Sequence, residues 1–102
     1  MYEIRFKGKQ QKKQFKKLLN KLSDKVKTKI RDILENHPYP SPSQGSTLCK
    51  VEQKGRLYCV EATGGDRILY DVIELAEKKK AVLVHYSGND DGEIAYLKKH
   101  SK

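Results

Sequence analysis

The fold of this chain is decided by residues 57–84, which read LYCVEATGGDRILYDVIELAEKKKAVLV. Runs of β-branched, aromatic and aliphatic residues in and just after this stretch are typical of strands. We expect three strands, at about 57–62, 67–73 and 81–86. Gly64-Gly65-Asp66 supplies a hairpin turn between the first two strands, and Lys78-Lys79-Lys80 closes the next turn. Arg67 therefore stands at the start of the middle strand.

The residues before this stretch predict one strand and two helices. Tyr2, Ile4 and Phe6 alternate with charged residues, the pattern of a half-buried strand. Apolar residues then recur at helical spacing in two segments, Phe15, Leu18, Leu19 and Leu22, followed by Val26, Ile30, Ile33 and Leu34. Ser23 is the expected N-cap of the second helix. Pro38 ends that helix, because the residue before a proline avoids helical geometry.

The remaining segments complete the predicted order. His37 to Ser46 is rich in proline and serine and is expected to be a loop. Leu48 to Glu52 should resume the sheet, and Lys54-Gly55 should form a tight hairpin turn. Asn89 to Gly92 has the composition of a polar loop, and Ile94 to Lys99 fits either a short C-terminal helix or an irregular tail.

Together these segments predict one α+β domain spanning residues 1–102. The expected order is β-α-α-β-β-β, with room for one more short strand or helix. The strands should form a small curved antiparallel sheet, and both helices should pack on one face of it.

Positive charge is concentrated in the first third of the chain. The formal net charge is +9, and the residues up to Asn36 hold twelve basic against four acidic side chains. The first helix should carry an exposed cationic face that includes Lys12, Lys13, Lys16 and Lys17. A one-sided basic surface attracts nucleic acid, acidic proteins or anionic membrane. Because no aromatic residues are interleaved with these lysines, the face should follow a nucleic-acid backbone without reading sequence.

Several classes of protein are disfavoured. No stretch approaches the roughly 20 apolar residues of a membrane-spanning helix, and the first residues have no signal-peptide core. Cys49 and Cys59 lack metal-type spacing and are expected to be reduced thiols, although neighbouring predicted strands leave a disulfide geometrically possible. We therefore expect a soluble cytoplasmic protein with no membrane partner.

The chain resembles the RelE/ParE superfamily of bacterial and archaeal toxins over nearly its whole length. The resemblance begins with the Tyr-Glu-Ile-Arg-Phe strand at residues 2–6 and the two amphipathic helices. It is strongest in Leu57-Tyr58 and in Gly65-Asp66-Arg67-Ile68-Leu69-Tyr70, which are similar to the family's Tyr-centred strand, glycine turn and Arg-hydrophobic-hydrophobic-Tyr strand. The segment from Val82 to Gly88 resembles the last family strand, with Tyr96 in the tail beyond it.

The resemblance implies a toxin that is silenced by an acidic antitoxin encoded beside it. RelE-like members cut messenger RNA inside the ribosome, and ParE-like members poison DNA gyrase. This sequence is closer to the RelE-like messenger RNA interferases, so the expected partners are mRNA, the ribosome with its ribosomal RNA, and the antitoxin. RelE-type cleavage uses no metal, so we expect no metal site and no cofactor. The alternatives are a non-catalytic member that binds nucleic acid or protein, and a ParE-like gyrase inhibitor.

The resemblance also assigns candidate catalytic residues. Arg67 matches the family's catalytic arginine, and a planar guanidinium can hold a phosphate through two hydrogen bonds. Its other interpretation is a surface arginine that pairs with a cross-strand glutamate. Tyr96 matches the C-terminal tyrosine, which can stack on a base or assist proton transfer. Tyr96 fits equally well as a tail aromatic that packs on the sheet.

This sequence departs from the family pattern in its cations. The lysines of the strand before the glycine turn fall at Cys59 and Glu61, and the second arginine of the tail falls at Gly92. Glu61 could act as general base, as could His85, since a histidine titrates near neutrality. Both also fit ordinary strand positions. Lys50, Lys54 and Arg56 could supply the lost positive charge, although a lysine-rich turn is commonly only solvated.

Overall fold

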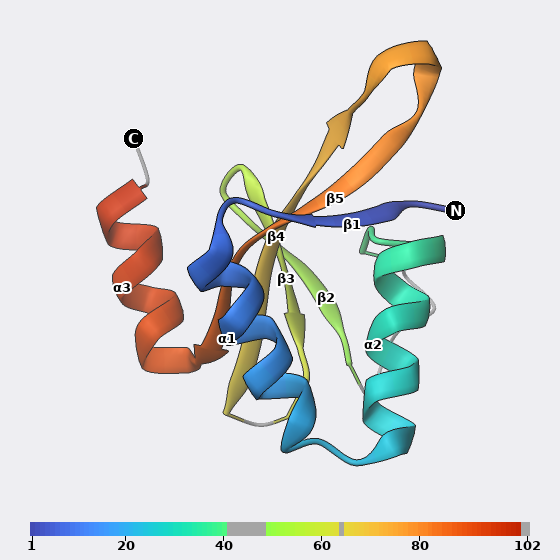
Figure 1. The fold of residues 1–102 in the computed structure, drawn as a ribbon. Helices are drawn as coiled ribbons and strands as arrows, with labels where there is room; N and C mark the ends of the chain where they lie inside the picture. The colour runs from blue at the N-terminus through green and yellow to red at the C-terminus, as the bar shows by residue number, and fades with distance from the viewer. Residues whose placement is uncertain (41–48, 64, 101–102) are drawn as a thin grey trace.

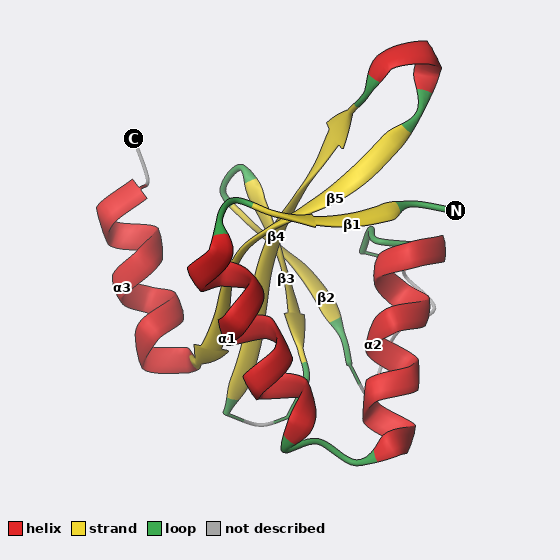
Figure 2. Ribbon diagram, in the orientation of Figure 1, coloured by secondary structure: helices red, strands yellow, loops and turns green. Residues whose placement is uncertain are grey.

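The computed structural model describes residues 1–40, 49–63 and 65–100. It has an α+β fold with a five-stranded sheet (Figures 1 and 2). The elements described are, in chain order, β1 (Glu3–Phe6), α1 (Lys9–Asn20), α2 (Asp24–Asn36), β2 (Val51–Lys54), β3 (Leu57–Glu61), β4 (Asp66–Glu74), a 3₁₀ turn (Ala76–Lys78), β5 (Lys80–Asn89) and α3 (Asp90–His100).

The sheet is mixed, with strand order β1-β5-β4-β3-β2. Strands β2 to β5 form an antiparallel meander, but β1 runs parallel to β5, with Glu3 opposite Ala81 and Phe6 opposite Val84. The prediction of an antiparallel sheet is therefore wrong at this edge. An alternating pattern fixes which side chains face the core and does not fix the direction of the strand. The chain crosses one face through α1 and α2 before it enters the meander, and β1 ends up beside the last strand.

Four strands follow the two helices, which uses the room for one more short strand that the predicted order left. One further difference concerns the order of elements. The predicted loop from Asn89 to Gly92 is also wrong, since β5 ends at Asn89 and α3 begins at Asp90. The Asn89 side chain accepts a hydrogen bond from the Gly92 backbone N–H at 2.8 Å, so this polar run starts a helix. The helical alternative for Ile94 to Lys99 is confirmed.

Other predicted elements are confirmed, some within limits. Ser23 caps α2, because its hydroxyl accepts a hydrogen bond from the Val26 N–H at 3.4 Å. Of the predicted Gly64-Gly65-Asp66 turn, Gly64 lies outside the described residues, but Ala62 N–H donates to the Asp66 carbonyl at 2.9 Å and closes the hairpin. Ser41 to Ser46 of the predicted loop, and Leu48 of the predicted strand, also lie outside the described residues.

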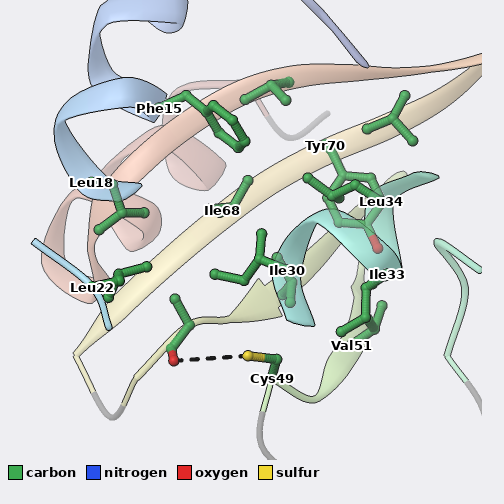
Figure 3. Close-up of a cluster of buried hydrophobic side chains, with 14 residues drawn as sticks. Phe15, Leu18, Leu22, Ile30, Ile33, Leu34, Cys49, Val51, Ile68 and Tyr70 are labelled. Carbon is green, nitrogen blue, oxygen red and sulfur yellow. Dashed lines mark hydrogen bonds between the residues drawn. The ribbon is translucent and has the colours of Figure 1, made fainter. Parts of the chain in front are cut away.

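The hydrophobic core lies between the sheet and the pair α1–α2 (Figure 3). Phe15 and Leu18 of α1, and Ile30 and Leu34 of α2, pack on one face of the sheet. That face carries Val51, Val60, Ile68, Tyr70, Val82 and Val84. The prediction that both N-terminal helices cover one face is confirmed by this packing. We call this face the core face.

The opposite face of the sheet is covered in part by α3, and we call it the α3 face. Cys59 and Leu69 point to this side and are buried. The β4–β5 ladder contains a bulge on this face. Leu69 of β4 pairs with Tyr86, while the next residue of β4, Tyr70, pairs with Val84, so β5 has one residue without a partner in the ladder. The extra residue is His85. A bulge of this kind bends the strand and redirects its side chain, and here it brings His85 to α3.

Candidate active site

Arg67 is held at the start of β4 by groups on three sides. Its Nη2 atom lies 3.9 Å from Glu61 Oε1, the cross-strand neighbour on β3, and its Nε atom lies 3.7 Å from Glu93 Oε1 on α3. Nη1 donates to the carbonyls of Thr63 and Asp66 at 2.9 and 3.2 Å. The side chain is only 15% exposed. The guanidinium is thus fixed in direction and paired with two carboxylates.

Glu93 is a site residue that the sequence analysis missed. It is 6% exposed, and its Oε2 atom has no hydrogen-bond partner within the described residues. Burial and the neighbouring Glu93 carboxylate together raise the pKa of the Cys59 thiol well above its usual range. Glu93 was hidden because the segment was interpreted as loop and tail. The spacing that could have revealed it is Glu93 to Tyr96, which puts both side chains on one side of a helix.

His85 and Tyr96 form the second pair of the site. The Nδ1 atom of His85 and the hydroxyl of Tyr96 lie 2.9 Å apart in a hydrogen bond. The Tyr96 ring also stacks on Tyr86, with ring centroids 6.1 Å apart and an interplanar angle of 27°. Burial raises the pKa of the Tyr96 hydroxyl, so this group remains protonated at neutral pH. A histidine hydrogen-bonded to a phenol can pass a proton in either direction.

The two pairs, Arg67–Glu93 and His85–Tyr96, lie in one seam between β3, β4, β5 and α3. Glu93 and Tyr96 are three residues apart on α3, so their side chains are neighbours along the helix. Glu93 contacts Arg67, and Tyr96 contacts His85. All four predicted catalytic residues therefore lie along this seam, in two contacting pairs. We call the group Arg67, Glu61, Glu93, His85 and Tyr96 the α3 seam.

The glycine at the position of the family's second arginine has a packing role. Gly92 and Gly88 both lie against the Tyr86 ring, whose hydroxyl donates to the Asn89 carbonyl at 2.9 Å. A Cβ atom on Gly92 would overlap the Tyr86 hydroxyl. An arginine here would displace either Tyr86 or α3. The close packing of α3 on the sheet therefore requires glycine, and excludes arginine, at position 92.

The three cations of the β2–β3 hairpin differ in their surroundings. Lys50 and Lys54 both pair with Glu52, at 3.6 and 3.3 Å. Glu52 is opposite Cys59 in the ladder, so this group lies on the α3 face. The hydrogen bond with Glu52 raises the pKa of Lys54, and the negative charge of Glu93 raises it further. Arg56 is exposed in the turn that follows Gly55.

The predicted lysine face is on the other side of the molecule. Lys12, Lys13, Lys16 and Lys17 are all exposed on α1, which packs on the core face. Only the C-terminal end of α1 approaches the end of β5, where Lys17 and Lys21 border a hollow with Tyr86 and Gly88. The structure thus keeps most of this charge apart from Arg67.

Cys49 and Cys59 are free thiols, as expected, and they lie on opposite faces of the sheet. Across the described residues, His, Cys, Asp and Glu form no group of three or more that could hold a metal ion. No helix in the part of the chain that the structure describes is long and apolar enough to cross a membrane.

Comparison with known proteins gives no match. No protein-family model, curated protein or solved structure is found to be similar to this chain. The resemblance to RelE-like toxins therefore rests on the sequence pattern described above.

Proposed function

We propose that this protein is a RelE-like toxin, a metal-independent endoribonuclease that cleaves messenger RNA on the ribosome. One arrangement supports the proposal above the others. A fixed guanidinium, two carboxylates and a histidine–tyrosine pair lie along one seam, and they come from β3, β4, β5 and α3. These are the kinds of group that phosphodiester cleavage by an internal hydroxyl requires.

The seam assigns a role to each residue. Glu61 takes the proton from the 2′-hydroxyl of the RNA, and the 2′-oxygen then attacks the adjacent phosphorus. Arg67 stabilises the added negative charge on the phosphate oxygens. The bond from phosphorus to the 5′-oxygen breaks, which leaves a 2′,3′-cyclic phosphate on one fragment. The His85–Tyr96 pair gives a proton to the departing 5′-oxygen, so the other fragment ends in a hydroxyl.

The reaction requires α3 to move away from Arg67. Nη1 of the guanidinium donates to two backbone carbonyls, while Nη2 and Nε lie 3.9 and 3.7 Å from Glu61 and Glu93. A phosphate that binds at Nε therefore has to take the place of the Glu93 carboxylate. The packing that opposes this movement is centred on Tyr86, which contacts Gly92 and the Tyr96 ring, whereas Ile94 of α3 is 53% exposed. In the closed arrangement the enzyme holds its own arginine neutralised.

Removal of the Tyr96 hydroxyl tests the proposed seam. The substitution Tyr96→Phe retains the ring that stacks on Tyr86 and removes the contact to His85. We expect wild-type protein to cut ribosome-bound messenger in a primer-extension assay, and we expect the variant to cut roughly 10²-fold more slowly. Tyr39→Phe, far from the seam, is the control and should cut at the wild-type rate. Equal cleavage by Tyr96→Phe and wild type would remove the His85–Tyr96 pair from the mechanism.

The second candidate function is a non-catalytic protein on the same fold that binds RNA or protein. One observation favours it: Cys59 is buried where the ribonuclease pattern has a lysine, and the neighbouring cations Lys50, Lys54 and Arg67 face as many carboxylates. RNA binding without cleavage in the same assay would support this function. Inhibition of gyrase supercoiling without RNA cleavage would support the ParE-like alternative.

The expected antitoxin is an acidic, partly disordered chain. The structure leaves β1 and β2 as the two edge strands of the sheet, and an extended peptide can add to such an edge through main-chain hydrogen bonds. The exposed lysines of α1 would favour acidic side chains on that peptide. A neighbouring gene product that co-purifies with this protein and stops cleavage is the expected observation.

A further inference from the structure

A hollow of about 310 Å³ lies between the C-terminal half of α1 and the end of β5. Its walls include Gln14 and Lys17 of α1, Lys21 at the C-terminal cap of that helix, and Tyr86, Ser87 and Gly88 of β5. The hollow follows from the unequal lengths of β1 and β5. β1 pairs with β5 only up to Val84, so the last residues of β5 have no strand beside them on that edge within the described chain. α1 runs past this open edge and forms the other wall.

Two buried polar atoms at this hollow have no partner within the described residues. Ser87 is 4% exposed and its hydroxyl makes no hydrogen bond, and Gln14 Oε1 is buried without a donor. Buried polar groups are nearly always hydrogen-bonded, so two such atoms from different elements at one hollow indicate a site that can bind a polar ligand. A ligand that satisfies both atoms needs a donor for the amide oxygen and a donor or acceptor for the hydroxyl.

The remaining walls specify the chemistry of that ligand. Lys17 and Lys21 bring positive charge to the rim, and Lys21 is itself held 3.0 Å from Asp66. Tyr86 belongs to the wall through its position in β5, while its ring stacks on Tyr96 on the α3 face. A base edge has the alternating donors and acceptors that Gln14 and Ser87 require, and a phosphate fits the lysines. The volume is at the lower end of the range for small-ligand pockets, which suits one nucleotide.

We propose that this hollow binds a single nucleotide of an RNA chain, with the base edge at Gln14 and Ser87 and the phosphate at Lys17. The proposal takes the RNA as ligand source from the proposed ribonuclease function. Gly88 pairs with Arg67 across β4 and β5, so the hollow and the α3 seam meet at the same strand ends. The hollow lies on the core face, where α1 packs, and the Arg67 side chain lies on the α3 face at the same strand ends. An RNA chain that occupies both sites passes around this end of the sheet from the lysine face of α1.

The test uses uncleaved mononucleotides, so that it does not depend on ribosomes or on catalysis. The four 5′-mononucleotides are titrated at millimolar concentrations into ¹⁵N-labelled protein, and chemical shifts are followed by NMR. Inorganic phosphate and a short acidic peptide are titrated in parallel. We expect saturable shifts at Ser87, Gln14 and Lys17 with at least one nucleotide, and weaker shifts with phosphate alone. No saturable nucleotide binding, equal binding of phosphate, or binding of the peptide alone would each overturn the proposal.

Two substitutions sharpen the test, because they separate binding from stability. Ser87→Ala and Gln14→Leu each remove one hydrogen bond to the ligand, so each should weaken nucleotide binding by about fivefold. Each also removes a buried unpaired polar atom, so the melting temperature without ligand should stay unchanged or rise by a few degrees. Gln10→Leu, on an exposed turn of the same helix, is the matched control for Gln14 and should leave binding unaltered.

The stability measurement can also contradict the inference. A melting temperature that falls in Ser87→Ala and Gln14→Leu would mean that the Ser87 hydroxyl and the Gln14 amide oxygen have structural partners. The hollow would then not be supported as a ligand site. The result is separable from the fate of the ribonuclease proposal. Nucleotide binding that persists in Arg67→Ala, in a protein that cuts no RNA, would leave the hollow supported and the catalytic assignment rejected.

Discussion

At the scale of single residues, Glu93 controls what Arg67 can bind. Its carboxylate is buried against Nε of Arg67, and its second oxygen has no hydrogen-bond partner in the described part of the chain. A buried acid in this position lowers the positive potential that a phosphate would encounter. It also holds α3 onto the sheet. In the proposed mechanism, the same residue therefore opposes phosphate binding electrostatically and supports the closed structure.

Substitution of Glu93 by glutamine separates these two effects. Glu93→Gln keeps the shape and removes the charge, and Arg67 retains its pair with Glu61. We expect the free energy of unfolding to fall by about 1–3 kcal/mol, because Arg67 loses its ion pair with a buried carboxylate. We expect the rate of messenger cleavage to rise, because Arg67 becomes more available to phosphate. Glu52→Gln, which affects only two lysines of the β2–β3 hairpin, is the control.

The comparison has a clear contrary outcome. If Glu93→Gln remains folded by circular dichroism and its cleavage falls as far as that of Arg67→Ala, then Glu93 is itself required for the chemistry. The role of general base would then move from Glu61 to Glu93.

At the scale of elements, α3 is attached to the sheet by close packing at one point. Gly92 fits against the Tyr86 ring only because it has no Cβ atom. Beneath the same helix lies Cys59, whose thiol is buried beside Glu93 and has a raised pKa. A thiol in this state reacts slowly with alkylating reagents, because the thiolate is the reactive form. Cys59 can therefore report whether α3 is open or closed.

Gly92→Ala should loosen α3. The added methyl group overlaps Tyr86, so we expect Cys59 to be alkylated faster, by about tenfold for each 1.4 kcal/mol by which the docking of α3 is weakened. Cys49 lies in the core on the other face, and its rate should not change. Gly65→Ala is the matched control, since a Cβ atom there meets no atom within 4 Å. Unchanged alkylation of Cys59 in Gly92→Ala would show that α3 does not depend on this contact.

The turn between β4 and β5 is a second feature at this scale. Glu77 and Lys78 both have positive φ angles, 63° and 65°, and Lys79 N–H donates to the Ala76 carbonyl at 3.4 Å. This is the geometry of a type I′ turn, which favours Asn-Gly and disfavours larger side chains. The turn lies at the tip of a hairpin that extends beyond β3 (Figure 1). The sequence thus accepts local strain at an exposed position.

Replacing Glu77-Lys78 by Asn-Gly should relieve that strain. We expect the double substitution to raise the free energy of unfolding by about 1–2 kcal/mol in urea denaturation. The control is Lys79→Gly, where φ is −77°. Glycine there relieves nothing and should lower stability by roughly 0.5–1 kcal/mol. A double variant that is no more stable than wild type would mean that the turn is unstrained.

At the scale of the whole molecule, the charge is divided between two sides. α1 presents a lysine face, while the α3 seam holds one arginine between two carboxylates. We expect the reversal of Lys12, Lys13, Lys16 and Lys17 to glutamate to weaken RNA binding for all sequences alike. The slope of log affinity against log salt should decrease by about 0.7 for each phosphate of single-stranded RNA that the variant no longer neutralises. Titrations at several salt concentrations measure this slope.

Reversal of Lys78, Lys79 and Lys80 at the hairpin tip is the control for the lysine face and should cost less affinity per charge. A wild-type affinity that does not vary with salt would remove the electrostatic basis of RNA binding. It would leave the basic surface as a solvated helix face.

Much of this architecture could be predicted from local patterns. Alternation identified β1, and helical spacing identified α1 and α2, because one side of each is buried. Runs of β-branched, aromatic and aliphatic residues between turn residues identified β3 to β5. The direction of β1 and the bulge at His85 could not be predicted, because both depend on which strand lies alongside. The sequence favoured a loop at Asn89 to Gly92 for a related reason, since polar residues suit both a loop and the first turn of a helix.

The candidate site was predictable only through its residue types. Arg67, Glu61, His85 and Tyr96 were selected from the sequence, and the structure brings them together along α3. Glu93 was missed, because its burial follows from the docking of a helix that the sequence left undecided. The packing of Gly92 on Tyr86 is a contact between two elements, and no local pattern encodes it.

Primer extension on ribosome-bound messenger tests directly whether Arg67 carries out phosphate chemistry. Wild type is compared with Arg67→Ala and Arg67→Lys, with circular dichroism to confirm folding. If Arg67 has this role, we expect cleavage by wild type and a loss of about 10²- to 10³-fold in Arg67→Ala. Arg67→Lys should fail as well, because lysine keeps the charge and loses the two-pronged geometry. Undiminished cleavage by Arg67→Ala, or no cleavage by wild type on competent ribosomes, would contradict this role.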